Sequence, residues 1–289
     1  MMVVLFCGGL GMRLRELTQE MPKPMVRIGE EPILIHLMRY YAHFGHRRFV
    51  LCLGHLGEVI IRHFLKSPGE PVVEALTGEV LRVHMRDSVS GPWTVTLVPT
   101  GLDASIGERL RTVRNYIDGE VFLANYADGL SDLELPTFLR RFGESGAVAG
   151  LLSVRLRSSM HLVASGEGGF LTEMRPVAKS DIRINGGFFA FRRRILDLLL
   201  PGEDLVDDLF PRLVETRELF GHVYDGFWGC MDTAKDWYAL ESMDAGGEAP
   251  WKVWRRIRRA SAAGAPLAQF REEPAYRLLG VQREVGELQ

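Results

Sequence analysis

The amino-acid sequence predicts an α/β protein built on a mixed, mainly parallel β-sheet with helices on both faces. Through the first 150 residues, short and continuously apolar segments alternate with longer segments whose apolar residues recur at helical spacing. This alternation is typical of βαβ units, and strands that are apolar throughout are typical of a parallel sheet covered on both faces. With 289 residues, 46% of them hydrophobic and 25% charged, the chain is long enough to bury a sizeable core.

The first elements follow directly from the start of the chain. The segment VVLFCGG (3–9) is predicted to be a buried strand that runs into glycines. A helix is predicted over 32–45, because a proline begins it, apolar residues follow at helical spacing and a glycine ends it. A second buried strand at 48–54 and a helix at 56–66 repeat the unit.

The same alternation continues to residue 154. The predicted elements are a strand at 94–101, a helix at 106–117, a strand at 121–128, a helix at 135–146 and a strand at 147–154. The stretch 67–92 is richer in glycine, proline, serine and charged residues. It is therefore predicted to be an excursion from the sheet.

From about residue 155 the pattern becomes richer in β-structure. The predicted elements are a hairpin at 161–177, a strand at 184–193, a helix at 205–219, a strand at 221–232 and a helix at 233–246. Beyond Trp254 the pattern dissolves, so we expect a domain over 1–254 and a C-terminal extension over 255–289 whose role is open. Its basic start, WKVWRRIRRASAA, favours a helix packed on its own domain over contact with a neighbouring subunit or a membrane.

The composition of the chain indicates the cellular compartment and the kinds of partner to expect. The three cysteines are odd in number, far apart and in apolar contexts, which favours reduced, buried thiols over disulfides or a zinc site. The first strand begins at once, which leaves no room for a signal peptide, and no apolar run approaches the roughly 20 residues that span a bilayer. We therefore expect a cytoplasmic protein. A net charge of −2 favours neither nucleic acid nor a membrane as partner.

The stretch FCGGLGMRLRELTQEMPKPM (6–25) combines glycines with cationic residues after a strand, a setting suited to binding phosphate. The dinucleotide pattern G-x-G-x-x-G fails, because Gly9 and Gly11 are followed by Leu14. The P-loop pattern fails too, because no Gly-Lys-Ser/Thr triplet follows. What remains is G-G-x-G-x-R-L followed by Pro-Lys-Pro.

This combination resembles the sugar-phosphate nucleotidyltransferases, and the resemblance runs in order through residues 1–254. Within that family the chain is most similar to the glucose-1-phosphate cytidylyltransferases, through PKPMVRIGEEPILIHLMRYYAHFGHRRFVLCLG, ANYADGLSD, INGGFFAF, GFWGCMDTAKD and APWKVW. The resemblance implies a Rossmann-like nucleotidyltransferase fold with a small β-rich, sugar-binding portion at about 155–235. It also implies Mg²⁺ as cofactor and a homo-oligomer.

The implied reaction transfers a cytidylyl group from CTP to a hexose 1-phosphate, with α-D-glucose 1-phosphate as the expected acceptor, and releases pyrophosphate. Both reactants are polyanions, so catalysis consists mainly of neutralising charge and aligning groups. Two alternatives stay open: the same chemistry with UTP, dTTP or another phosphorylated acceptor, and a catalytically silent nucleotide-sugar sensor or scaffold. The presence of Lys23, Asp128 and Asp232 disfavours the second.

The residues that would do this work can be named. Lys23, stiffened by a proline on each side, and Arg13 are the expected catalytic cations. Asp128 and Asp232 each follow a predicted strand and suit Mg²⁺, although each could instead form a turn or cap a helix. By resemblance, the nucleotide is contacted by Gly8, Gly9, Leu10, Gly11, Gly107 and Arg109, and the sugar phosphate by Arg175, Lys179, Asn185 and Gly186.

Two positions depart from the family pattern. Met12 stands where relatives often have threonine, whose hydroxyl could serve a phosphate. Relatives also show Glu-Lys-Pro ahead of Asn-Gly-Gly, with the lysine on the sugar phosphate. Here Arg175 occupies that slot and Lys179 is a second candidate, so the sugar pocket is expected to differ.

Overall fold

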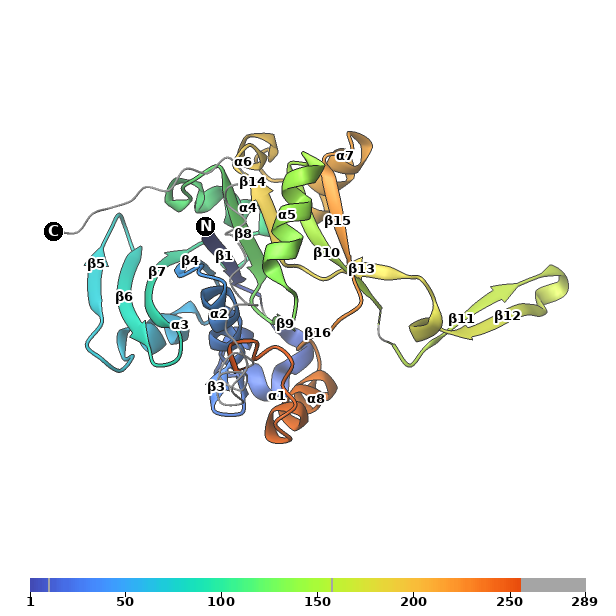
Figure 1. Ribbon diagram of the computed structural model, residues 1–289, viewed down its shortest axis with the longest axis horizontal. Helices are drawn as coiled ribbons and strands as arrows, with labels where there is room; N and C mark the ends of the chain where they lie inside the picture. Colours follow the sequence, from blue (N-terminus) through green and yellow to red (C-terminus); the bar gives the residue numbers. More distant parts are fainter. Residues whose placement is uncertain (10, 157, 256–289) are drawn as a thin grey trace, which may run out of the picture.

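The computed structural model describes residues 1–9, 11–156 and 158–255, and a ten-stranded mixed sheet forms its centre (Figure 1). The strand order is β13-β10-β14-β8-β1-β4-β7-β6-β5, and β15 pairs with β10 outside this path. The four central strands run parallel: β7 (Gly91–Pro99), β4 (Arg48–Leu53), β1 (Met2–Cys7) and β8 (Val121–Tyr126). The predicted α/β architecture is confirmed. The predictions for Leu10 and for 256–289 lie outside the described residues.

Outer strands extend the parallel centre on both sides. They are β5 (Val72–Ala75), β6 (Leu81–Asp87), β10 (Ala149–Arg155), β13 (Arg183–Asn185), β14 (Phe189–Arg192) and β15 (Leu219–Tyr224). All of their pairings are antiparallel except β10 with β15. The prediction that 67–92 leaves the sheet is therefore wrong for β5 and β6. These strands form the half-exposed edge of the sheet, where polar and charged residues are tolerated and a buried-strand pattern is absent.

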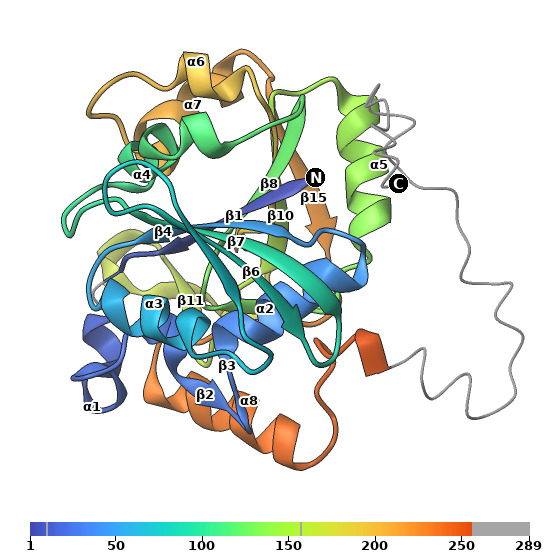
Figure 2. The same cartoon turned by 90° about the vertical axis from the view of Figure 1, so that its left-hand side faces the viewer.

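Helices cover both faces of the sheet, as predicted. In β1 the side chains alternate, with Val3, Leu5 and Cys7 in one core and Met2, Val4 and Phe6 in the other. The first core is covered by α2 (Ile33–His43), α3 (Gly57–Leu65) and α5 (Leu135–Ser145). The second is covered by α4 (Ile106–Thr112), α6 (Ile195–Leu198) and α7 (Phe210–Glu215). Figure 2 shows α2 and α3 on one side of the sheet and α4, α6 and α7 on the other.

Two predicted strands are each divided in the structure. The segment 184–193 becomes β13 and β14, because Gly187 and Phe188 adopt left-handed backbone angles between them. The segment 221–232 becomes the end of β15 and the separate β16 (Trp228–Cys230). The predicted helix at 205–219 is a π-helical turn, η6 (Leu205–Leu209), followed by α7, and it gives way to β15 at Leu219.

A two-stranded hairpin projects from the body as an arm, formed by β11 (His161–Ser165) and β12 (Leu171–Pro176) (Figure 1). This confirms the predicted hairpin at 161–177. Its exposed side chains include large apolar ones: Met160, Val163, Phe170, Leu171 and Met174.

Six short elements and the 12-residue helix α8 lie outside the ten-stranded sheet. They are η1 (Met12–Leu14), α1 (Arg15–Thr18), η2 (Lys23–Met25), β2 (Arg27–Ile28), β3 (Glu31–Pro32), β9 (Gly129–Ser131) and α8 (Ala234–Ala245). The 3-10 turns η3 (Arg114–Tyr116), η4 (Glu167–Gly169) and η5 (Val177–Lys179) complete the elements. In the described part of the chain, no helix is long and apolar enough to cross a membrane.

A buried ion pair anchors the edge of the sheet to α2. The guanidinium of Arg39 donates to Asp87 at 2.8 and 3.0 Å and to Glu31 at 2.8 Å, and the side chains of Arg39 and Asp87 are 8% and 5% exposed. Burial acts to raise the pKa of Asp87, but hydrogen bonds from Arg39 and Ser90 outweigh it and leave that pKa below its ordinary value.

We expect Asp87→Asn to lower the free energy of unfolding by about 3 to 5 kcal/mol, because it leaves the buried Arg39 without its main charge partner. Urea denaturation followed by circular dichroism measures the loss. Asp118→Asn is the matched control, since Asp118 pairs with Arg48 at an exposed position and its loss should cost less than about 1 kcal/mol. Equal losses in the two variants would contradict the role of the buried pair.

Candidate active site at the carboxyl edge of the sheet

Lys23 lies between two carboxylates. Its Nζ is 2.6 Å from Oδ2 of Asp128 and 2.9 Å from Oδ1 of Asp232, and its side chain is 13% exposed. The flanking prolines hold Lys23 in a tight 3-10 turn, in which Met25 N donates to Pro22 O at 2.8 Å. Rigid backbone on both sides limits the positions that the ammonium group can reach.

The two aspartates are 104 positions apart in the sequence and meet through a small antiparallel ladder. Asp128 lies two residues past the end of the central strand β8, and the next strand, β9, pairs with β16 so that Gly129 faces Cys230. A backbone hydrogen bond from Met231 N to Asp128 O, at 2.9 Å, extends this pairing to the aspartates. The structure therefore brings together Lys23, Asp128 and Asp232 from three separate parts of the chain.

Asp232 does not cap the helix that follows it. Thr233 is the N-cap residue of α8, and it forms a capping box with Asp236. The carboxylate of Asp232 is thus available to Lys23 and to Arg13, which also donates to it. The sequence left a turn or a helix cap as alternative roles for Asp232, and the structure excludes the helix cap.

The cluster stabilises the charged forms of Lys23 and Asp232. Burial acts to lower the pKa of Lys23, but the charge of Asp128 and hydrogen bonds to both aspartates raise it above its ordinary value. Burial acts to raise the pKa of Asp232, but hydrogen bonds from Lys23 and Arg13 lower it below its ordinary value. With Arg13 included, two cations and two carboxylates balance each other.

A cavity of about 470 Å³ adjoins this cluster at the carboxyl ends of β1 and β8. One side is formed by the glycine loop and the Pro-Lys-Pro turn, and the other by the loop that leads into α4. The lining residues are Phe6, Gly8, Gly9, Lys23, Pro24, Leu102, Asp103, Ala104, Ser105, Ile106, Arg109, Tyr126, Ala127, Asp128 and Asp204. Crevices outside the carboxyl ends of parallel strands are where α/β sheets bind ligands.

Arg109 is buried under this cavity and holds the strand ends together. Its guanidinium donates to Thr100 Oγ1 at 2.7 Å and to the carbonyl oxygens of Leu53, Gly101, Leu102 and Gly8 at 3.0 to 3.3 Å. These acceptors follow β1, β4 and β7, so one side chain joins three neighbouring loops. Burial lowers the pKa of Arg109. Arg109 lines the cavity, but the prediction that it contacts the nucleotide stays a prediction.

The glycines serve different purposes. A Cβ at Gly8 would overlap the guanidinium of Arg109, so a side chain is excluded there, whereas a Cβ at Gly9 would meet open space. Gly11 has a left-handed φ of +61° and its carbonyl closes the turn into η1. A Cβ at Gly107 would overlap Glu203 O, so Gly107 serves the packing of α4 on η6, and it does not line the cavity.

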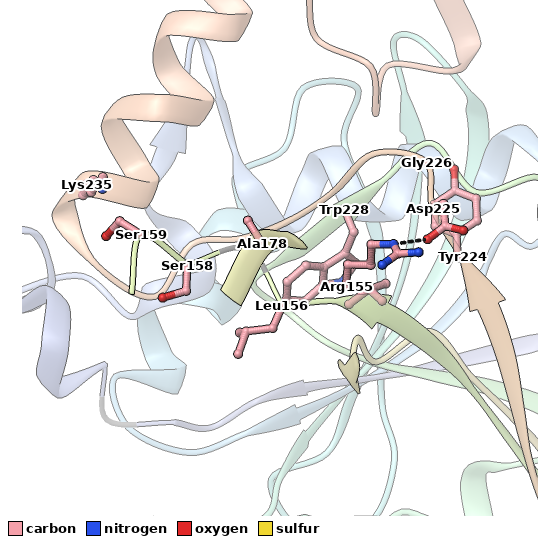
Figure 3. Close-up of a pocket in the computed structure, with 11 residues that line it drawn as sticks. Arg155, Leu156, Ser158, Ser159, Ala178, Tyr224, Asp225, Gly226, Trp228 and Lys235 are labelled. Atoms are coloured by element: carbon pink, nitrogen blue, oxygen red, sulfur yellow. Dashed lines mark hydrogen bonds and ion pairs between the residues drawn. The ribbon is translucent and has the colours of Figure 1, made fainter. Parts of the chain in front are cut away.

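A second cavity, of about 530 Å³, opens between the end of β10, the base of the hairpin and α8 (Figure 3). Its lining residues are Val154, Arg155, Leu156, Ser158, Ser159, Ala178, Tyr224, Asp225, Gly226, Trp228 and Lys235. In Figure 3 the indole of Trp228 lies near the middle of this set, and Arg155 points to Asp225, with which it pairs at 3.0 Å.

Asn185 and Gly186 contact residues of both cavities. Trp228 Nε1 donates to Gly186 O at 2.8 Å, and Asn185 Nδ2 lies 3.5 Å from the hydroxyl of Tyr126. Trp228 lines the second cavity and Tyr126 lines the first. The Asn-Gly pair of the sequence motif thus contacts one residue of each cavity, although neither Asn185 nor Gly186 lines a cavity itself.

The two candidate phosphate cations are placed elsewhere. Arg175 lies on β12 in the projecting hairpin, where it pairs with Glu173 at 3.1 Å and lines neither cavity (Figure 1). Lys179 is exposed in η5, next to Ala178 of the second cavity. The structure does not bring Arg175 to Lys23, and both roles stay predictions.

Sequence reasoning missed several residues of the two cavities. Tyr126 ends a buried strand and Asp204 precedes a predicted helix, positions that are common and carry no signal by themselves. Trp228 lies inside a motif that the resemblance had identified as a whole, and its indole N–H is committed to Gly186. The hydrogen bonds by which Arg109 joins the strand ends could not be predicted, because most of their acceptors are backbone carbonyl oxygens, which every sequence has.

The carboxylate pair fits a divalent metal with few protein ligands. Within the described ranges no group of three or more His, Cys, Asp or Glu side chains could hold a metal ion. Asp128 and Asp232 both direct an oxygen at one cation, the ammonium of Lys23. Mg²⁺ is commonly held by one or two carboxylates together with phosphate and water, so the donor set suits it.

Comparison with known proteins agrees with this geometry. The model of the family described as "Nucleotidyl transferase" matches residues 2–75. The chain is 34% identical over 262 residues to proteins of Salmonella typhi and Salmonella typhimurium named glucose-1-phosphate cytidylyltransferase, with 88% of this chain and 100% of theirs covered. A solved structure of UDP-glucose pyrophosphorylase from Acinetobacter baumanii superposes with a TM-score of 0.60 at 16% identity, covering 90% of this chain and 98% of that one. The last likeness concerns the fold alone.

We expect Lys23→Met to tighten Mn²⁺ binding at least about tenfold without any nucleotide, because the ammonium of Lys23 occupies the place between the two carboxylates. Charge-assisted hydrogen bonds contribute about 1.5 to 3 kcal/mol each, and 1.4 kcal/mol corresponds to tenfold. Electron paramagnetic resonance of free Mn²⁺ in a titration measures the affinity.

Lys66→Met is the matched control, since Lys66 is exposed at the end of α3, and its affinity for Mn²⁺ should equal that of the unchanged protein. Adding Asp128→Asn to Lys23→Met should remove the gain. If Lys23→Met binds Mn²⁺ no more tightly than the control, Lys23 does not compete with the metal.

Proposed function

The chain belongs to the sugar-phosphate nucleotidyltransferase family, and on this premise we propose that it transfers a cytidylyl group from CTP to α-D-glucose 1-phosphate and releases pyrophosphate. One observation carries the proposal at the level of the site: Lys23 is held between Asp128 and Asp232 at the edge of a cavity formed by the glycine loop. A triphosphate in this cavity would meet backbone of the loop on one side and the lysine at its end.

In the proposed reaction, an oxygen of the sugar phosphate attacks the α-phosphorus of CTP. A new P–O bond forms there, the bond from the α-phosphorus to the oxygen that bridges to the β-phosphate breaks, and pyrophosphate leaves with the bonding electrons. A phosphate oxygen needs no base to activate it, so the chain has to supply charge and alignment. Lys23 is buried enough to stay in place and steadies the α-phosphate. Arg13 pairs with Asp232 on a side chain that is 75% exposed, and it is proposed to bind the leaving pyrophosphate.

Asp128 and Asp232 are the residues proposed to hold Mg²⁺. When bound, the ion neutralises charge on the phosphates and brings nucleotide and protein carboxylates together. Burial acts to raise the pKa of Asp232, but hydrogen bonds from Lys23 and Arg13 lower it, which favours the ionised form that binds metal. When the phosphate groups bind, Lys23 and Arg13 exchange their carboxylate partners for phosphate oxygens. Neither cation is then left without a partner of opposite charge.

The acceptor is proposed to extend from Lys23 past Asn185 and Gly186 into the second cavity. An amide both donates to and accepts from sugar hydroxyls, and the face of Trp228 offers an apolar surface to a sugar ring. In sequence, Lys179 is closer than Arg175 to Ala178, which lines this cavity. Both cations remain candidates for binding the sugar phosphate. The projecting hairpin with its exposed apolar side chains supports the proposal of a homo-oligomer.

The donor and the acceptor are tested together by pyrophosphate release. The protein is assayed with Mg²⁺ and each of CTP, UTP, dTTP and GTP, combined with glucose 1-phosphate, mannose 1-phosphate or galactose 1-phosphate. We expect the highest kcat/KM with CTP and glucose 1-phosphate. A higher value for another pair would change the assigned specificity, and no release with any pair would refute the enzyme.

We expect Lys23→Ala to lower kcat at least about 100-fold, because it removes a positioned charge that stabilises the transition state. Circular dichroism should show an unchanged fold, since Lys23 lies at the edge of the core. Lys66→Ala, an exposed lysine remote from both cavities, serves as the control and should keep its kcat. Activity of Lys23→Ala close to the control would mean that another group neutralises the α-phosphate.

A further inference from the structure

The turn between β13 and β14 has a strained backbone. Gly187 and Phe188 both adopt left-handed angles, with φ of +71° and +50°. Glycine adopts this region without cost, but a phenylalanine rarely does. Such a conformation persists only where the surrounding structure holds it. The two strained residues directly follow Asn185 and Gly186 in the sequence.

A buried amide on the central sheet holds this turn. Asn125 lies on β8 and is 1% exposed. Its Oδ1 accepts a hydrogen bond from Phe188 N at 3.0 Å, and its Nδ2 donates to the hydroxyl of Tyr41 at 3.1 Å. A Cβ at Gly187 would lie only 2.5 Å from Oδ1, so the turn wraps closely around the amide.

The side chain of Phe188 also holds the turn in place, through packing in the core. Its ring is 1% exposed and packs edge-to-face on Tyr40, with centroids 5.4 Å apart, and it also contacts Tyr41 at 6.1 Å. Backbone and ring of Phe188 are thus both fixed. The peptide N–H bonded to Asn125 has no freedom to find water instead.

This turn determines where the Asn-Gly pair lies. Asn185 Oδ1 accepts from Gly187 N at 2.9 Å, so the amide of Asn185 is oriented by the turn itself. Gly186 is held by Trp228 on one side and by β10, where Gly186 N donates to Leu152 O at 2.8 Å. A shift of the turn would move Asn185 and the Gly186 carbonyl together.

We propose that Asn125 is a positioning residue for the sugar-phosphate acceptor. It stands on β8, which ends at Tyr126, a residue that lines the first cavity, and its Oδ1 accepts a hydrogen bond from the turn that follows Asn185. One rigid strand therefore sets the distance between the reacting centre at Lys23 and the residues that hold the acceptor. The inference rests on the proposed function, in which Asn185 and Gly186 bind the acceptor.

The test compares variants that keep or lose the acceptor atom at Oδ1. Asn125→Leu has a similar size but leaves Phe188 N–H unbonded in the core, so the turn should relax. We expect its KM for glucose 1-phosphate to rise at least about tenfold, while its KM for CTP stays within about twofold. Asn125→Asp keeps an oxygen at this position, and it should keep both KM values within about threefold of the unchanged enzyme.

Tyr41→Phe is the matched control, because it removes the other hydrogen bond of the same amide and leaves the bond to Phe188. It should lower the melting temperature and change neither KM. Asn125→Ala takes the place of the leucine variant if leucine prevents folding, with the same expected change in the KM for glucose 1-phosphate.

The inference is overturned if the two KM values rise together in Asn125→Leu or if Tyr41→Phe raises the KM for glucose 1-phosphate equally. It is also overturned if Asn125→Asp raises the KM for glucose 1-phosphate as much as Asn125→Leu does. Failure of the proposed function would look different, since the unchanged protein itself would release no pyrophosphate from CTP and glucose 1-phosphate.

Discussion

The ion-pair cluster of Lys23 with Asp128 and Asp232 is the interaction on which the site depends. It joins a loop after the first strand, the loop after β8 and the start of α8. The ladder between β9 and β16 and the capping box of α8 exist on either side of it, and together they leave the two carboxylates directed at one point. A site for polyanions that is electrically balanced when empty has a physical advantage, because a partly buried lysine alone would favour losing its proton or its position.

Arg109 plays the complementary part under the cavity. A buried guanidinium without a carboxylate partner is costly, and here carbonyl oxygens from three strand ends satisfy its hydrogen bonds. The cost explains why Gly8 is required, since any side chain there would displace the guanidinium. The positive charge that remains under the floor of the cavity adds to the attraction for phosphate groups, whether or not the arginine contacts them.

The strand β8 connects the first cavity to the turn between β13 and β14. β8 ends at Tyr126, which lines the first cavity, and Asn125 of the same strand holds the turn that follows Asn185. Strained backbone at Phe188, a glycine that fits against an amide and a buried aromatic cluster occur together at this turn. They are consistent with a need to hold two substrates at a fixed separation, as transfer between two phosphates requires.

The sequence by itself determined the alternation of strands and helices, the hairpin at 161–177 and the family, and it singled out Lys23, Asp128 and Asp232 as candidate site residues, whose roles stay predictions. Those features are carried by local periodicity and by short motifs, which need no knowledge of distant contacts. It did not determine that the edge strands β5 and β6 join the sheet, that Arg175 lies on the hairpin, or that Gly107 serves packing against Glu203. Only the tertiary structure decided which partners each side chain has. Arg109 binds carbonyls and Asn125 binds a peptide N–H, and such partners exist at every position of every chain, so only the folded arrangement selects among them.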